Sequence, residues 1–196
     1  MSILKRFVSY YKPHKVMLTL DMLAALLMCI DTDGNLYAVD ELCQPSLTLS
    51  EAAERVAGLC RGRSVEFAVA SPDLWNRRQD SGKSGFEIMQ RVAGMPPMLP
   101  ADHRRIPGWR LTREYLSTEN HAPSLRISSR CRELIRCLPA LLCDPERPED
   151  ASGEPHSVTH APEALRYAIM SRCPPPKEAD SSDFCFTRRP HSPFFD

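Results

Sequence analysis

The chain has 196 residues, of which 42% are hydrophobic and 26% are charged, a composition typical of a folded domain. Its 25 basic and 25 acidic residues cancel, which excludes a uniformly basic DNA coat and an acidic tail protein. The net charge changes along the chain: it is −6 over residues 16–75, +6 over residues 76–136 and −4 over residues 137–196. Acidic flanks around an arginine-rich middle would suit a metal site beside a phosphate-binding surface, although solvated surface charge explains the same counts.

The first 30 residues combine a basic start with an apolar run. The run from Val16 to Ile30 is interrupted only by Asp21, and it is shorter than the roughly 20 residues that a membrane-spanning helix needs. It also lacks the small residues of a secretory cleavage site. Residues 2–29 resemble the start of the membrane domain of an ABC-type exporter. We therefore expect residues 1–29 to be an atypical apolar segment, with Asp21 in a helical context.

After this segment the pattern alternates between strands and helices, which indicates an α/β domain over residues 30–172. Two capping boxes, Thr48 with Glu51 and Ser84 with Glu87, mark the starts of helices. Stretches in which every second residue is apolar are typical of half-buried strands. The strands expected in one sheet are 36–39, 65–69 and 125–127; the expected helices are 49–60, 84–92, 109–116, 129–138 and 160–172; and a proline-rich connection is expected at 95–107.

The cysteines and the C-terminal residues bear on the compartment and on the domain limits. None of the eight cysteines forms a C-x-x-C pair, so a zinc ribbon is not expected. Small apolar core residues are the simpler interpretation, and we expect reduced thiols in a cytoplasmic protein. Residues 173–196 include three consecutive prolines and are expected to form a disordered tail.

Acidic residues in the domain suggest a metal site. Asp73 follows the end of an expected core strand, which is where α/β folds place their ligands. Glu163 lies in the first turn of the last expected helix, close in sequence to His160, and Asp150 lies in the loop before it. Carboxylates brought together in this way can hold the magnesium ions used in phosphodiester hydrolysis. The alternative is that Glu163 is an ordinary acidic residue at a helix N-terminus.

Several segments resemble, in the same order, the nuclease domain of phage terminase large subunits. Together they lie within residues 30–172, and the last is the most specific. They are Ala70–Gly82, Asp102–Trp109, Cys131–Arg136, Leu138–Leu141, Pro148–Asp150 and His160–Tyr167. The resemblance implies an RNase H-like α/β fold, with a mixed sheet flanked by helices. It also implies a metal-dependent endonuclease that cuts concatemeric phage DNA during genome packaging with Mg²⁺ or Mn²⁺.

The same resemblance implies the roles of particular residues. The family's second metal-binding acid corresponds to Asp73, although Ser71 stands where that acid often precedes a proline. The third corresponds to Glu163, with His160 and Asp150 as further metal ligands. The first acid belongs to a strand before residue 31, where the exporter-like segment leaves nothing to match, so the first strand is expected to be missing or replaced. The motor ATPase of a complete large subunit is also missing from the sequence.

The resemblance gives the expected partners as double-stranded phage DNA, the portal protein and the small terminase subunit, with no small-molecule cofactor. The residues expected to bind DNA are Arg77, Arg78, Arg104, Arg105 and Arg110. The alternative interpretation is a catalytically dead prophage remnant with at most weak DNA binding, because two-metal hydrolysis usually fails without one of its acids. A membrane-associated fragment led by residues 1–30 is a third interpretation.

Overall fold

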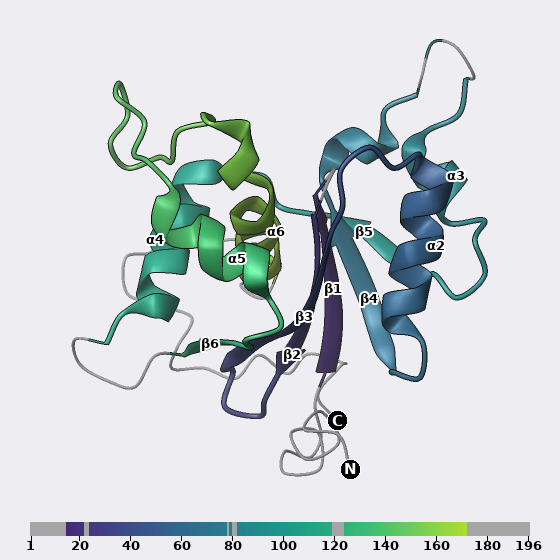
Figure 1. Cartoon of the computed structure of the whole chain (residues 1–196), viewed down its shortest axis with the longest axis horizontal. Coiled ribbons are helices and arrows are strands. Elements are labelled where there is room, and N and C mark those ends of the chain that lie inside the picture. Colours follow the sequence, from purple (N-terminus) through teal and green to yellow (C-terminus); the bar gives the residue numbers. More distant parts are fainter. Residues whose placement is uncertain (1–14, 22–23, 78, 80–81, 119–123, 172–196) are drawn as a thin grey trace, which may run out of the picture.

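A computed structural model describes residues 15–21, 24–77, 79, 82–118 and 124–171, with the backbone alone for residues 15–21. These residues form one six-stranded mixed sheet with helices on both faces (Figure 1). The strand order is β5-β4-β1-β2-β3-β6. The strands are β1 (Lys15–Asp21), β2 (Ala24–Ile30), β3 (Leu36–Cys43), β4 (Val65–Ala70), β5 (Met98–Pro100) and β6 (Leu125–Ile127).

The sheet combines an antiparallel meander with parallel additions at both sides. Strands β1, β2 and β3 pair antiparallel in sequence order. Strand β4 then lies parallel to β1, and β5 lies parallel to β4. Strand β6 completes the other side, parallel to β3. Strands β1, β4 and β5 consequently run in the same direction, and their C-terminal ends share one edge of the sheet.

Each face of the sheet carries its own group of helices. Figure 1 shows α2 and α3 on one side of the sheet and α4, α5 and α6 on the other. Three short 3₁₀ helices connect the larger elements. The helices are α2 (Leu49–Cys60), α3 (Gly85–Met89), α4 (Arg105–Leu116), α5 (Arg132–Cys137) and α6 (His160–Met170), and the 3₁₀ helices are η1 (Pro72–Trp75), η2 (Leu138–Ala140) and η3 (His156–Val158).

Strand β2 shows how the sheet separates two cores. All seven of its residues are buried. Leu26 and Met28 join the cluster that includes the apolar side of α6, whereas Leu27 and Cys29 join the cluster under α2. Since successive side chains of a strand point to opposite faces, a strand covered on both faces has to be apolar throughout.

The turn between β2 and β3 is organised by a buried carboxylate. Asp31 accepts hydrogen bonds from the backbone N–H groups of Asp33 and Asn35, from the Asn35 amide and from the Tyr37 hydroxyl. Gly34 has φ of 86°, the left-handed conformation that glycine adopts without strain. The expected tight turn is therefore present, at the edge of the sheet opposite the C-terminal ends of β1 and β4.

The N-terminal part of the fold corrects the sequence interpretation. Residues 15–21 form β1 in the middle of the sheet and residues 24–30 form β2, so a strand does occupy the first position and Asp21 ends it. The helical context expected for Asp21 is wrong, because residues 15–21 form a strand, and no described residue of this segment lies in an exporter-like helix. In the described part of the chain, no helix is long and apolar enough to cross a membrane. Residues 1–14 and the expected tail at 173–196 lie outside the described residues.

The remaining differences concern the ends of elements. The strands expected at 36–39, 65–69 and 125–127 are confirmed as members of one sheet. The proline-rich connection contains β5, an edge strand of three residues, and proline is tolerated at sheet edges. Helix α4 begins at Arg105 rather than at 109, because Pro107 in its first turn has no intrahelical hydrogen bond to lose.

Candidate functional site

One edge of the sheet gathers the C-terminal ends of three neighbouring strands. The register pairs Leu20 of β1 with Ala70 of β4, and Ala70 with Pro100 of β5. The next residue along β1 is its last, Asp21. In the adjacent strand, Ser71 follows Ala70 and leads directly into η1, which contains Asp73. Two acidic residues therefore lie at or just beyond the C-terminal ends of neighbouring strands, the position at which open α/β sheets bind their ligands.

Helix α6 brings a third acidic residue to this edge. Tyr167 packs with Val69 near the end of β4 and with Ala101, which directly follows β5. The preceding residue of α6 is Arg166, whose side chain donates a hydrogen bond to the carbonyl of Arg104 at 3.2 Å, just beyond β5. Glu163 pairs with Arg166 through its Oε2, 2.6 Å from the Nη2 of Arg166. Glu163 therefore lies at the same edge of the sheet as the C-terminal ends of β4 and β5.

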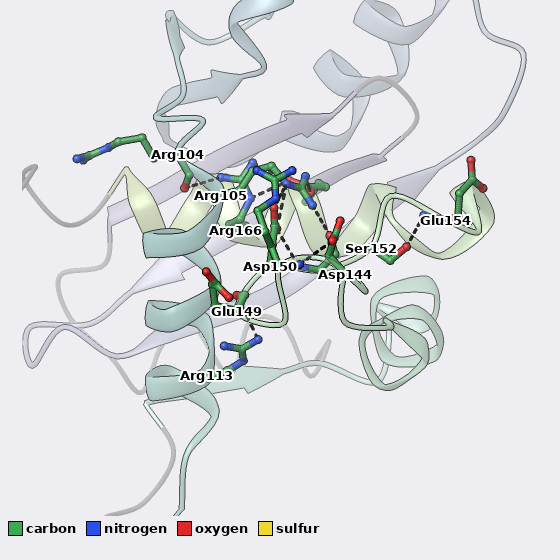
Figure 2. A network of polar contacts seen from close by, with 12 residues as sticks. Arg104, Arg105, Arg113, Asp144, Glu149, Asp150, Ser152, Glu154 and Arg166 are labelled. Carbon is green, nitrogen blue, oxygen red and sulfur yellow. Dashed lines mark hydrogen bonds and ion pairs between the residues drawn. The ribbon is translucent and has the colours of Figure 1, made fainter.

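The loop before α6 is a narrow hairpin that presents Asp150. Its two sides meet in an isolated antiparallel bridge between Cys143 and Ala151. Within it, the N–H of Asp144 donates to the carbonyl of Asp150 and the N–H of Asp150 donates to the carbonyl of Arg147. Figure 2 shows Asp150 pointing toward Arg105 of α4. The hairpin thus fixes a carboxylate, only 5% exposed, against the start of α4.

Arg105 joins the hairpin to α6. Its Nε donates to both carboxylate oxygens of Asp150, at 3.0 and 3.1 Å, and its Nη2 donates to the carbonyl of Ala151 at 2.8 Å. Its Nη1 is paired with Oε1 of Glu163. We call Arg105, Asp150, Glu163 and Arg166 the Arg105 cluster. The structure thus brings together two of the expected metal ligands, but with an arginine between them.

The electrostatics of the Arg105 cluster favour the charged guanidinium. Partial burial opposes the charge of Arg105, but the hydrogen bonds to Asp150 and the negative charge of Glu163 outweigh it and raise the pKa of Arg105. Two positive and two negative side chains make the cluster formally neutral. Each carboxylate oxygen of Glu163 is engaged by a different guanidinium group.

Asp73 has its hydrogen bonds within its own segment. Its carboxylate accepts from the Ser71 hydroxyl at 3.4 Å and from the Asn76 amide at 3.3 Å, and its side chain is exposed. His160 is the first residue of α6. Among the residues whose side chains are described, no three His, Cys, Asp or Glu are grouped so as to hold a metal ion. The proposed proximity of Asp73 to Glu163 stays a prediction.

The donors available at this edge are nevertheless chemically suited to a divalent ion. Mg²⁺ and Mn²⁺ prefer carboxylate oxygens, and Asp150 and Glu163 already contact a single cationic group. Asp21 is a further acidic residue, the last of β1. The residues fit such an ion in type, whereas the present partners of Glu163 are arginines.

The expected DNA-binding arginines occupy different surroundings. A groove of about 580 Å³ opens beside the Arg105 cluster, and its lining includes His103, Arg104, Arg105 and Arg147. Arg110 is exposed further along α4. Arg104 is held by Asp102, with Nη2 2.6 Å from Oδ2. Arg77 lies after η1 in a bridge with Ser84, and Arg78 lies outside the described residues.

Sequence reasoning missed two residues of this edge. Asp21 was assigned to a helix, although the short alternation Leu18-Thr19-Leu20-Asp21 also fits a strand. Arg166 was assigned no role, although it lies three positions after Glu163, the spacing at which oppositely charged helix residues meet. The side chain of Arg166 is only 1% exposed, and the buried guanidinium is stabilised by its pairing with Glu163 and by its hydrogen bond to the Arg104 carbonyl.

Comparison with solved structures places the fold. No protein-family model matches the chain, and no curated protein matches it by sequence. The nuclease domain of the large terminase of bacteriophage SPP1, solved with bound Mn, is similar with a TM-score of 0.54 and 17% identity, over 82% of this chain and 85% of that one. The large terminase nuclease of thermophilic phage G20c, solved with bound magnesium, is similar with a TM-score of 0.50 and 14% identity, over 81% and 82%.

At these identities the likeness concerns the fold. The neighbours are nuclease domains, and the likeness extends over four fifths of the chain. The expectation from the sequence segments is confirmed at this level: the chain has the RNase H-like α/β fold of large terminase nuclease domains.

Proposed function

We propose that the chain is a terminase-type nuclease domain that cleaves duplex DNA with a divalent metal ion. The observation that supports the proposal is the position of three acids in the fold: Asp21 ends β1, Asp73 lies in η1 just after the adjacent β4, and Glu163 lies in the first turn of α6. The fold likeness to metal-bound nuclease domains supports the same assignment.

In this proposal the protein side chains have separate tasks. Asp21, Asp73 and Glu163 supply the oxygen donors, with Asp150 and His160 close in sequence or space to Glu163. A bound divalent ion would supply an activated water and stabilise the leaving oxygen of the phosphodiester. Arg104 and Arg110, at the start and on the exposed side of α4, would attract the DNA backbone. In phage DNA packaging the corresponding substrate is concatemeric DNA, and the portal protein and small terminase subunit are the proposed partners.

A nicking assay on supercoiled plasmid tests the proposal. We expect slow nicking with Mn²⁺ and little with Mg²⁺, which tolerates an imperfect site less well. Asp21→Asn, Asp73→Asn and Glu163→Gln should each abolish nicking. Asp33→Asn is the matched control, because Asp33 is an exposed acid at the opposite edge of the sheet. Full activity in all three site variants would show that the acids at this edge do not carry the reaction.

A second candidate function is a DNA-binding domain that no longer cleaves. The engagement of both Glu163 oxygens by arginines favours it, because a carboxylate paired in this way is not free to bind a metal. This domain would bind duplex DNA without sequence preference. Its affinity would fall steeply with salt: the logarithm of the binding constant, plotted against the logarithm of the salt concentration, would have a slope of about −0.9 for each phosphate neutralised. Binding that is absent at low salt, or insensitive to salt, would contradict both candidates.

A further inference from the structure

The Arg105 cluster holds two cationic groups with very different freedom to move. Arg166 is 1% exposed, pairs with Glu163, donates to the Arg104 carbonyl and lies over the ring of Tyr167 at 4.6 Å. Arg105 has 38% of its side chain exposed and lines the groove of about 580 Å³. Of the two guanidinium groups on Glu163, only that of Arg105 has adjacent space into which it can move.

Arg105 also occupies the space between the two carboxylates. Its Nε contacts both oxygens of Asp150, which lies beside Arg105 in Figure 2. Its Nη1 contacts Oε1 of Glu163. A small divalent cation bound to those oxygens would need the same positions. With Arg105 in place the cluster is neutral, so an added dication meets no net attraction; without it, the cluster carries one negative charge.

We infer that Arg105 is an internal counter-ion that a divalent cation must displace from Glu163. Arg105 thereby sets the affinity with which the carboxylates of Asp150 and Glu163 bind the metal ion. The inference rests on the proposed function. Arg105 is thus a positioning residue, because it keeps Asp150 and Glu163 together in the metal-free protein and competes for their oxygens. The exchange is of one cation for another, and no bond is formed or broken.

The test is Mn²⁺ binding measured by isothermal titration calorimetry, with no DNA and no turnover. Arg105→Gln keeps hydrogen-bonding capacity but removes the charge, and we expect Mn²⁺ to bind at least about tenfold more tightly than to the wild type. Adding Glu163→Gln to Arg105→Gln should remove the gain. Arg105→Lys, which restores a cation without the fork that spans both carboxylates, should keep a severalfold gain over the wild type, smaller than that of Arg105→Gln.

Arg63→Gln is the matched control. Arg63 pairs with Asp40, 2.9 Å away, and Asp40 keeps a second arginine, Arg130, just as Glu163 keeps Arg166. Arg63 precedes β4 and therefore lies toward the other edge of the sheet. This variant should bind Mn²⁺ as the wild type does. An equal gain in Arg63→Gln would mean that any lost positive charge raises the affinity, and it would overturn the inference.

Two other outcomes separate the inference from the proposed function. If Glu163→Gln weakens Mn²⁺ binding while Arg105→Gln leaves it unchanged, the metal site stands and the competition by Arg105 is refuted. If neither the wild type nor Arg105→Gln binds Mn²⁺ saturably, both the inference and the metal-dependent part of the proposed function fail. Far-UV circular dichroism establishes that each variant is folded. If Arg105→Gln does not fold, Arg105→Lys decides: a severalfold gain over the wild type is expected, and an unchanged affinity overturns the inference.

Discussion

Helices α4 and α6 pack closely at Gly108, and the substitution of this residue by alanine tests the packing that supports the Arg105 cluster. A Cβ at this position would lie 2.7 Å from Cγ and 2.9 Å from Cδ of Arg166, and 3.2 Å from Cγ of Met170. Ordinary contacts between carbon atoms are about 3.5–4.0 Å. The Arg166 stem cannot easily move aside, because its guanidinium is held by Glu163 and by the Arg104 carbonyl.

The expected magnitude follows from two opposing effects. Overpacking of this kind costs about 1–3 kcal/mol, whereas replacing glycine by alanine inside a helix gains about 0.8–1.0 kcal/mol. Gly58 in α2 provides the matched control, because its added Cβ would have no described atom within 4 Å apart from its chain neighbours and the backbone of its own helix. Gly58→Ala should therefore stabilise the protein by about 0.4–1 kcal/mol. Gly108→Ala should lie about 1–3 kcal/mol below Gly58→Ala in its free energy of unfolding.

Urea unfolding followed by far-UV circular dichroism measures both variants against the wild type. The difference should appear in the midpoint with an unchanged slope, since the surface exposed on unfolding is the same. In thermal unfolding, a difference of this size corresponds to roughly 2–4 °C for each kcal/mol. If Gly108→Ala were stabilised as much as Gly58→Ala, α4 and α6 would not be in the tight contact described, and the placement of Arg105 against Glu163 would lose its support.

Three further predictions concern other parts of the fold. Ser84→Ala should lower the free energy of unfolding by about 1 kcal/mol in a urea titration, because Ser84 is the buried N-cap of the box formed with Glu87; no change would contradict the capping geometry. Burial opposes the ionisation of Asp31, but the hydrogen bonds that it accepts outweigh burial and lower its pKa. Its stabilising contribution is therefore complete above the unfolded pKa of about 3.9 and is lost as the pH falls through the lower folded pKa, so Asp31→Asn should flatten the pH dependence of stability below about pH 4. Cys143 is exposed, whereas burial raises the pKa of Cys131 to about 12, so mass spectrometry after alkylation at pH 8 should find Cys143 modified before Cys131, which should react only after unfolding.

The elements that sequence reasoning placed correctly are those with local signals. The capping boxes at Thr48 and Ser84 are both present, each with its serine or threonine and glutamate bonded reciprocally. Strand β4 and helix α6 were likewise expected from short periodic patterns. These features depend on residues at most four positions apart, so the sequence alone contains the relevant information.

The central strands could not be placed in the same way. Strand β2 is buried on both faces, so it shows no alternation and its sequence is as apolar as that of a buried helix. No glycine, proline or asparagine stands between Asp21 and Ala24 to indicate a turn. The pairing of β1 with both β2 and β4 decides its structure, and that pairing is a property of the whole sheet.

The acidic residues of the candidate site could be predicted from the sequence, but the arginine that pairs with them could not. The approach of Asp150 to Glu163 was expected from the loop that precedes α6. Arg105 was expected to face DNA, yet it lies 45 positions from Asp150 and 58 from Glu163 in sequence and pairs with both. Ion pairs between residues so far apart leave no local sequence pattern. They can be identified only from the packing of α4 against α6.

The central position of β1 has a consequence for synthesis on the ribosome. Strands β1, β2 and β3 are made first and can pair as a meander, but the other side of β1 has no partner until β4 has been made. Val65 follows Asp21 by roughly 45 residues, which is several seconds at about 5–20 residues per second. During that interval the nascent chain presents an open, apolar strand edge, the kind of surface that pairs with other chains. Slow synthesis or high expression should therefore favour aggregation of chains that end between β3 and β4, and chaperones that bind nascent strands should improve the yield of folded protein.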